Sequence, residues 1–250
     1  MQAGWIAHFM RAVVRPAMLA SLDVSSEFFP VAMRVPRPSK AIALTFDDGP
    51  HPHFTPRVLD VLAQYKMRAT FFVVGDRVVK YPEIVRSIVA AGHALGNHTY
   101  THPRCADLTR EEFLNEISRT QAAIADCCPT APLPRWFRPP WASLTFRQTY
   151  SLWREGWHVA LWSASCGDRT SSATVEQVTR EALRVNSRDI LLMHDAAHVT
   201  PDVLECLLPA LCQRGIQSVT LNDVYVRSRT SRDVTRNNNR TLSRIFHVVG

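Results

Sequence analysis

The sequence has 250 residues, of which 46% are hydrophobic and 20% are charged. Such a composition excludes an intrinsically disordered chain and is typical of one globular α/β domain with a large core. The formal net charge is +7, and most of this surplus comes from six arginines against a single acid, Asp233, in residues 227–250. The rest of the chain is therefore close to neutral. We expect no nucleic-acid partner.

The two ends of the chain differ in composition from the part between them. Residues 1–39 are predicted to form an amphipathic lead-in, because Arg11 and Arg15 interrupt their apolar residues. They contain no apolar run near the roughly 18 residues of a membrane span, and no convincing signal peptide. We therefore expect a cytoplasmic protein, peripheral to the membrane at most. Residues 227–250 are predicted to be a flexible basic tail, with an anionic membrane surface as its alternative partner.

Strand-like and helix-like segments alternate between residues 40 and 226. Short apolar runs predict the strands, and apolar residues at helical spacing predict the helices between them. In chain order the predicted elements are a strand at 41–46, a helix at 55–65, a strand at 69–75, a helix at 81–92, a strand at 93–97, a helix from Thr109, strands at 135–141 and 158–164, a helix at 172–185, a strand at 189–195, a helix at 201–215 and a strand at 217–224. This alternation predicts a parallel sheet, either open or closed into a barrel.

Polar side chains recur where the predicted strands end. In a parallel sheet the carboxyl ends of the strands lie at one edge, and functional side chains gather there. The residues at these positions are Asp47, Asp48, His98, Arg138, Asp168, His194 and Asp195. Because five predicted strands end in this way, the residues predict one functional site.

The segment "HTYTH" places His98 and His102 four residues apart. Two imidazoles at this spacing can face one divalent metal ion, although paired surface histidines are common without one. A carboxylate from another strand end would complete a two-histidine, one-carboxylate site, and either Asp47 or Asp48 can supply it. The remaining aspartate would then be close enough to act as a general base on an attacking water. This division of roles explains why two acids stand side by side after an apolar strand.

Five segments of the chain, taken in order, resemble the motifs of a known family. They are "TFDDGPHP", "HTYTH", "RPPW", "WSASCGD" and "ILLMHD", within about residues 40 to 225. Their order and content resemble the polysaccharide deacetylase family, also called the NodB-homology or chitin deacetylase family. The resemblance implies an α/β fold, a distorted (β/α) barrel with about seven parallel strands, and a catalytic domain at residues 40–226. It also implies metal-dependent hydrolysis of the N-acetyl group on an amino sugar of a glycan or oligosaccharide.

The same resemblance implies a role for each motif residue. Asp47 would be the general base, oriented by Arg138, and His194 the general acid, paired with Asp168. The implied metal ligands are Asp48, His98 and His102. This donor set suits Zn²⁺ first and tolerates Co²⁺, Mn²⁺ or Ni²⁺.

Four further residues are expected to contact the substrate. By resemblance, the backbone N–H of Trp141 would help to hold the oxyanion, and Leu192 would line the pocket for the acetyl methyl group. Pro139 lies in the same "RPPW" motif, and Trp162 stands just before the fourth motif. We expect both to border the substrate cleft.

The fourth motif departs from the family pattern at two positions. The family tends to have an acid where this chain has Ser165, and a tryptophan where it has Arg169. That tryptophan helps to wall the acyl pocket, so the change affects the expected acyl preference. Arg169 could contact an anionic group of the substrate or point to solvent.

Other functions compete with deacetylation. A related acyl hydrolase could remove a formyl group from a lipid-linked or small-molecule amino sugar, or acetate from an ester. A non-catalytic carbohydrate-binding relative would be expected to have lost at least one of Asp47, His98, His102 and His194, and all four are present. A haloacid-dehalogenase-type phosphatase needs D-x-D spacing, which the adjacent Asp47 and Asp48 do not provide.

Overall fold

The computed structural model describes residues 31–36 and 39–225. The predictions for the first 30 residues and for the tail at 227–250 lie outside this range. Strands occupy Val31–Ala32 (β1), Ala43–Asp47 (β2), Ala69–Val73 (β3), Ala94–Asn97 (β4), Trp136–Phe137 (β5), His158–Ala160 (β6), Ala164–Ser165 (β7) and Ile190–His194 (β8). Helices occupy Phe54–Gln64 (α3), Gly75–Lys80 (α4), Pro82–Ala90 (α5), Arg110–Cys127 (α6), Phe146–Arg154 (α7), Val175–Ala182 (α8), Thr200–Gln213 (α9) and Leu221–Tyr225 (α10). Short 3₁₀ turns occur at Cys105–Asp107 and Pro140–Ala142.

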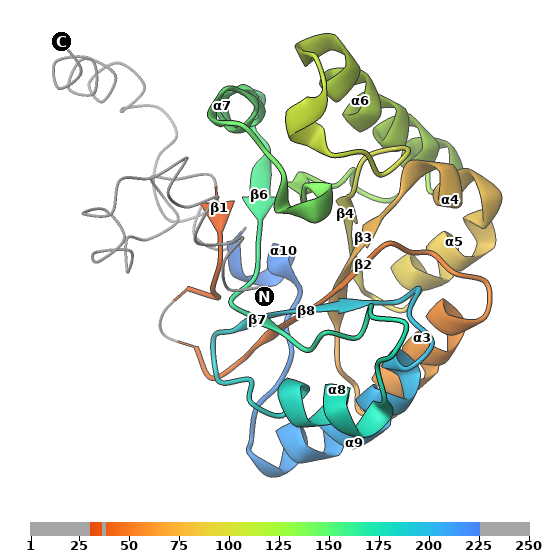
Figure 1. The fold of residues 1–250 in the computed structure, drawn as a ribbon. Helices are drawn as coiled ribbons and strands as arrows, with labels where there is room; N and C mark the ends of the chain where they lie inside the picture. Colours follow the sequence, from red (N-terminus) through yellow and green to blue (C-terminus); the bar gives the residue numbers. More distant parts are fainter. Residues whose placement is uncertain (1–30, 37–38, 226–250) are drawn as a thin grey trace, which may run out of the picture.

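The eight strands form a single sheet in the order β1-β6-β5-β4-β3-β2-β8-β7, and every strand pair is parallel. The sheet is curled, and its outside is covered by helices such as α3, α5, α6 and α9 (Figure 1). This confirms the α/β fold and the distorted barrel, with eight strands where about seven were expected.

One short segment connects two strands that lie near opposite ends of the strand order. Residues 158–164 were predicted to be one strand, and that prediction is wrong. The segment forms β6, which pairs with β1 and β5, and then β7, which pairs with β8 at the opposite end of the strand order. The linking residues bond to both sides, since the Leu161 N–H donates to the Ala32 carbonyl and the Ser163 N–H to that of Ile190. Three residues can cover this distance because the two ends of the sheet lie close together.

Successive residues of a strand point to opposite faces of the curled sheet. In β2, Leu44 and Phe46 belong to the main apolar core, which also contains buried side chains of α3, α5 and α9. Ala43 belongs to a different cluster, with side chains from β3, β5, β6 and β8. The period of two therefore places Thr45 and Asp47 on the inner face, above Ala43. Burial on both faces explains why the strand sequence is almost entirely apolar up to its end.

The predicted strand at 217–224 is also wrong. In the structure Ser218 makes an isolated bridge to Ile42, and α10 follows. Leu221 and Tyr225 of α10 pack into the inner cluster with Trp136, and the Tyr225 hydroxyl donates to the Arg34 carbonyl at 2.7 Å. In a short segment the same apolar pattern is compatible with a strand and with a short helix, so tertiary packing decided between them.

The sheet begins before residue 40, where the sequence placed the start of the catalytic domain. Val31 and Ala32 of β1 pair with Val159 and Ala160 of β6. This part of the predicted lead-in is therefore an edge strand of the sheet. Within residues 31–36 and 39–225, no helix is long and apolar enough to cross a membrane.

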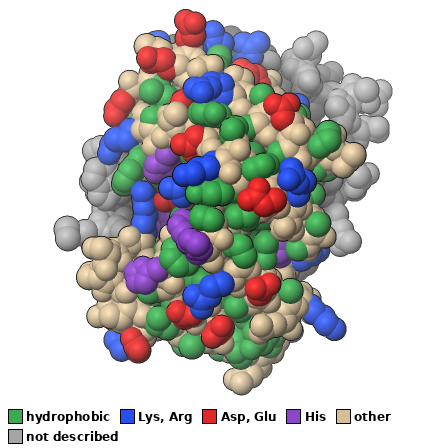
Figure 2. Space-filling view, turned by 90° about the vertical axis from the view of Figure 1, so that its right-hand side faces the viewer, with side chains coloured by type: hydrophobic (Ala, Val, Ile, Leu, Met, Phe, Trp, Pro, Cys, Tyr) green, Lys and Arg blue, Asp and Glu red, His purple; other side chains and the backbone are tan. Residues whose placement is uncertain are grey.

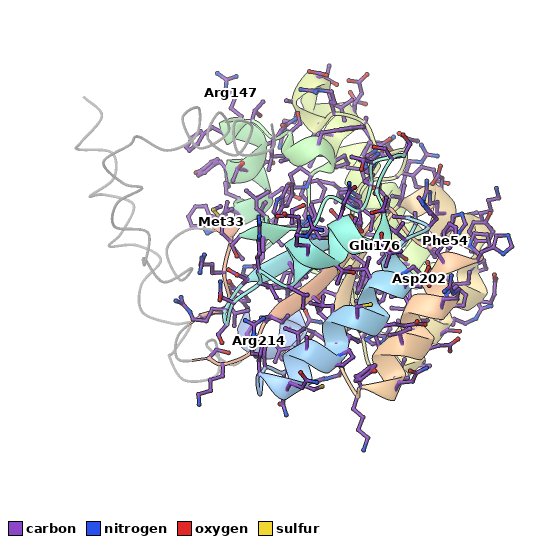
Figure 3. The ribbon with its side chains drawn as sticks, turned by 60° about the horizontal axis from the view of Figure 1, so that its bottom comes forward. Met33, Phe54, Arg147, Glu176, Asp202 and Arg214 are labelled. Carbon is purple, nitrogen blue, oxygen red and sulfur yellow. The ribbon has the colours of Figure 1, made fainter. Side chains whose placement is uncertain are left out.

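The helices that follow the strands begin near the carboxyl edge of the sheet. Phe54 and Asp202 mark the first turns of α3 and α9, which lie side by side in Figure 3. Arg57 of α3 pairs with Asp202 at 2.5 Å. The loops that lead into these helices contain the polar motif residues, so the fold brings those motifs to one edge.

Candidate active site

Asp47 and Arg138 form a buried ion pair at the end of β2. Arg138 Nη1 lies 2.7 Å from Asp47 Oδ1 and 2.8 Å from Thr45 Oγ1. The other guanidinium nitrogens donate to the carbonyls of Ala160 and Leu161, each at 3.0 Å. Arg138 is fully buried and Asp47 is 4% exposed. Because its hydrogen bonds fix the guanidinium, it holds Asp47 Oδ1 in place and leaves Oδ2 to face the histidines.

The guanidinium of Arg138 is also enclosed by aromatic rings. Its central carbon lies 4.2 Å from the ring centroid of Phe72 and 5.7 Å from that of Trp162. A cation stacked on aromatic faces is stabilised by their quadrupoles, and the rings exclude water. The guanidinium connects β2, through Thr45 and Asp47, to the carbonyls at the end of β6.

Asp48, His98 and His102 come together as a set of three potential metal ligands. Asp48 Oδ1 lies 2.9 Å from His102 Nε2 and 3.4 Å from His98 Nε2. One ligand atom from each residue lies within 4.8 Å of those of the other two. Asp47 Oδ2 is 3.8 Å from His98 Nε2, so the second aspartate borders the set without belonging to it.

The three residues fit a divalent metal ion. Asp48 Oδ1 is buried and makes no hydrogen bond of proper geometry, despite the two nearby imidazoles. His98 Nδ1 lies 2.7 Å from the Arg138 carbonyl, which fixes the proton on Nδ1 and leaves Nε2 as a free ligand. Two neutral imidazoles, one carboxylate and a hydrogen-bonded outer contact are the usual arrangement of such sites.

The backbone is unusual at three of the site residues. Asp48, His102 and Trp141 have φ values of 70°, 61° and 60°, in the left-handed region that non-glycine residues rarely adopt. Strain of this kind persists where surrounding contacts hold it, and it occurs often at functional sites. Arg77 contributes one such contact by donating to the Asp48 carbonyl.

The pKa of Asp48 shows how strongly its surroundings favour the charged form. Burial by itself would raise this pKa, but the neighbouring imidazoles of His102 and His98 outweigh burial. The pKa therefore lies well below its ordinary value. The carboxylate is ionised throughout the range where proteins function, as a metal ligand must be.

His194 and Asp168 form the second pair of the site. His194 Nδ1 lies 2.8 Å from Asp168 Oδ1, and the His194 backbone N–H donates to Asp168 Oδ2 at 2.6 Å. Burial favours a neutral imidazole, but the hydrogen bond and charge of Asp168 outweigh it, and the pKa of His194 is raised. Its Nε2 is thus the atom free to donate a proton. Register places His194 beside Asp47 in the neighbouring strand.

The residues predicted to contact substrate lie around these two pairs. Leu192 is 6% exposed and occupies the inner side of β8, two residues before His194. Trp141 is 53% exposed, and its ring centroid lies 5.5 Å from that of His102. Pro139 is buried beside Arg138, and Trp162 is half-buried. The structure brings all of these residues to one region, while their roles toward a substrate stay predictions.

Two supporting residues were not identified from the sequence. Glu116 of α6 accepts the backbone N–H groups of Tyr100 and Thr101, both at 2.7 Å, and so holds the loop between the two histidines. The sequence signal for a buried role of Glu116 was its position next to Ile117, on the apolar side of the helix. Thr200 donates to Asp168 Oδ2 at 2.7 Å, and no pattern in the sequence pointed to it.

The site opens to solvent on one side. The side chains of His102 and His194 are 17% and 12% exposed, whereas that of Arg138 is fully buried. Figure 2 shows a face where histidine side chains reach the surface beside Lys and Arg, with apolar side chains around them. A polar substrate could therefore approach the imidazoles directly.

Comparisons with known proteins agree with this geometry. The model of the polysaccharide deacetylase family matches residues 34–154. The chain is 32% identical over 209 residues to a peptidoglycan-N-acetylglucosamine deacetylase of Bacillus cereus, covering 81% of this chain and 74% of the relative. It is 34% identical over 193 residues to a chitooligosaccharide deacetylase of a Bradyrhizobium species, covering 72% of this chain and 88% of the relative.

A solved structure shows the same similarity in three dimensions. It is a crystal structure of a peptidoglycan N-acetylglucosamine deacetylase in complex with 4-naphthalen-1-yl-N-oxidanyl-benzamide. The TM-score is 0.76 at 30% sequence identity, covering 80% of this chain and 94% of that chain. The similarity thus extends over most of both chains.

Proposed function

Because the chain belongs to the polysaccharide deacetylase family, we propose that it is a metal-dependent hydrolase that removes the N-acetyl group from N-acetylglucosamine units of a glycan. The names of the relatives support this substrate class, since they act on peptidoglycan or chitooligosaccharides. The observation that carries the proposal is the arrangement of the site. A three-residue ligand set borders the buried Asp47–Arg138 pair, and the strand register places His194, paired with Asp168, beside Asp47.

Asp48, His98 and His102 would hold the metal ion, and we propose Zn²⁺ as its identity. Two imidazole nitrogens and one carboxylate form a donor set that suits Zn²⁺ and also accepts Co²⁺, Mn²⁺ or Ni²⁺. When bound, the ion supplies Lewis acidity, which polarises the amide carbonyl and makes water a better nucleophile.

Asp47 acts as the general base. Its Oδ1 is held by Arg138 at 2.7 Å, and its Oδ2 faces the ligand set, so this oxygen is the one that takes the proton of the attacking water. The positive charge of Arg138 attracts the Asp47 carboxylate across the 2.7 Å contact. The rigid guanidinium also keeps the carboxylate from rotating into the ligand set.

His194 acts as the general acid. Asp168 bonds to Nδ1 and stabilises the imidazolium, so the proton on Nε2 is available to the leaving amine. Protonation of the amine allows the carbon–nitrogen bond to break and acetate to leave. Leu192, beneath His194 on the same face, is suited to contact the acetyl methyl group.

Acetate release tests the proposed function. The metal-loaded protein is incubated with N-acetylglucosamine oligomers and with peptide-free peptidoglycan fragments, and free acetate and free amine are measured. Equal amounts of both products are expected, and the variant His98→Ala should release neither. N-formylated and O-acetylated sugars are assayed in parallel, and hydrolysis of these without any release of amine from the N-acetyl sugars would favour the alternative acyl hydrolases. A metal-loaded wild type that leaves every amide intact would contradict the proposal.

A further inference from the structure

Arg169 projects from a rigid turn beside the ligand set. The preceding residue, Asp168, is 1% exposed and accepts hydrogen bonds from His194 and Thr200. Gly167 adopts a φ of +74°, which a residue with a side chain would rarely adopt. The backbone at Arg169 is therefore fixed by the same contacts that hold the acid pair. The contacts of Asp168 with His194 and Thr200 therefore determine where the side chain of Arg169 begins.

The guanidinium of Arg169 is held on two sides and open on the third. Its Nε lies 3.3 Å from Asp48 Oδ2, and its central carbon lies 4.6 Å from the ring centroid of Trp141. Arginine has five N–H donors. Within the described part of the chain, its two terminal nitrogens make no hydrogen bond, and the side chain is 44% exposed. A pre-oriented fork of donors therefore faces solvent next to the ligand set.

We propose that Arg169, stacked on Trp141, forms a subsite for a carboxylate carried by the sugar substrate. The flat guanidinium fork matches a carboxylate bidentately, and stacking on the indole keeps its plane fixed. Asp48 contacts both Arg169 and His102, so the subsite lies directly beside the ligand set where the amide would react. The substrate is then an acidic amino-sugar glycan, in which the carboxylate belongs to a sugar next to the N-acetylglucosamine unit that is deacetylated. This inference rests on the proposed deacetylase function.

The buried arginine of the site, Arg138, cannot fulfil this role. Arg138 is fully buried and its donors are used by Asp47, Thr45 and two carbonyls. Arg169 is positioned differently, with its terminal donors turned to solvent. A residue needed merely to neutralise Asp48 would affect all substrates equally. A residue that binds a carboxylate would affect acidic substrates selectively, and this difference can be measured.

The test uses two substrates that differ in a single group. One is a peptide-free peptidoglycan tetrasaccharide with free lactyl carboxylates, and the other is the same tetrasaccharide with these carboxylates reduced to alcohols. The ratio of kcat/KM for the two is compared between wild type, Arg169→Gln and Arg169→Lys. Arg180→Gln, an equal charge change at the exposed end of α8, is the control. The metal content of each protein is measured alongside.

The wild type should prefer the acidic tetrasaccharide. Arg169→Gln should lower the ratio about 10-fold, which is typical of one lost charge-assisted pair. Arg169→Lys should lower it less, because the charge remains while the fork is lost. Arg180→Gln should leave the ratio at the wild-type value. A variant that merely loses metal would slow both substrates equally, which would overturn the subsite.

Binding to the two tetrasaccharides, measured calorimetrically, separates the subsite from the proposed function. If the wild type releases no acetate but still binds the carboxylate form more tightly through Arg169, the function fails and the subsite stands. If acetate is released with the same ratio in wild type and Arg169→Gln, the function stands and the subsite fails. A wild type that does not distinguish the two forms in binding or turnover would also overturn it.

Discussion

Asp47 and Asp48 are adjacent in sequence, but changing each to asparagine should affect different properties, namely stability and turnover for Asp47 and metal binding for Asp48. Asp47 neutralises the buried charge of Arg138, and both side chains are almost completely buried, at 5% and 0% exposed. Removing one partner of a buried pair typically costs about 3–5 kcal/mol. Arg138 keeps its bonds to Thr45 and to two carbonyls, so the lower end of that range applies. For a chain of this size, about 3 kcal/mol lowers the melting temperature by roughly 6–12 °C.

Asp48→Asn should act mainly through the bound metal. Its pair with Arg169 is partly exposed and contributes at most about 1 kcal/mol, but Asp48 also loses its buried contacts with His98 and His102. The metal-free melting temperature should therefore fall in this variant as well. The bound metal should be affected more, since loss of an outer contact by itself typically costs about 10–100-fold in affinity and Asp48 is a proposed direct ligand.

The assay is a thermal melt with and without added Zn²⁺, together with metal analysis and acetate release. A ligand at 100 times its Kd stabilises the folded state by about 2.7 kcal/mol. Wild type and Asp47→Asn should both gain stability with Zn²⁺, and Asp48→Asn should not. Asp47→Asn should retain metal but lose roughly 10²–10⁴-fold in kcat. Asp202→Asn, in an exposed pair with Arg57, should match wild type in every measurement. Equal metal loss in the Asp47 and Asp48 variants would refute the division of roles.

Three further outcomes follow from the contacts of the site. Asp168 raises the pKa of His194, which must be protonated to act as the acid. Asp168→Asn should therefore move the alkaline limb of the kcat/KM profile to lower pH. An alkaline limb that stays in place would show that Asp168 does not support His194 as the acid. Glu116→Ala should weaken metal binding by about 10–100-fold in a calorimetric titration, because the histidine loop loses its anchor, and unchanged affinity would assign Glu116 to folding alone. A Cβ on Gly96 would lie 2.4 Å from Phe72 Cδ1, so Gly96→Ala should destabilise the fold by about 1–3 kcal/mol in denaturant unfolding, and an unchanged midpoint would show that Phe72 can move aside.

The sequence by itself determined the class of fold and the membership of the site. Apolar runs alternating with helical patterns can bury their surface together in a parallel sheet covered by helices, and parallel strands end at one edge. Residues at strand ends must therefore meet, which is why the chain's residue order alone was enough to name Asp47, His98, Arg138, Asp168 and His194. The acid–histidine pairing of Asp168 with His194 followed from the family resemblance and is found at 2.8 Å.

The tertiary structure decided what local pattern leaves open. The segment 158–164 has one continuous strand pattern, but the closing of the sheet divides it between β6 and β7, which lie near opposite ends of the strand order. The segment 217–224 has a strand-like pattern, but its second half forms α10, whose side chains pack into the inner cluster. Arg169 could equally have pointed to solvent, and its place between Asp48 and Trp141 depends on a turn anchored by distant residues. Each of these outcomes depends on contacts between segments far apart in the chain, and a local pattern contains no information about such contacts.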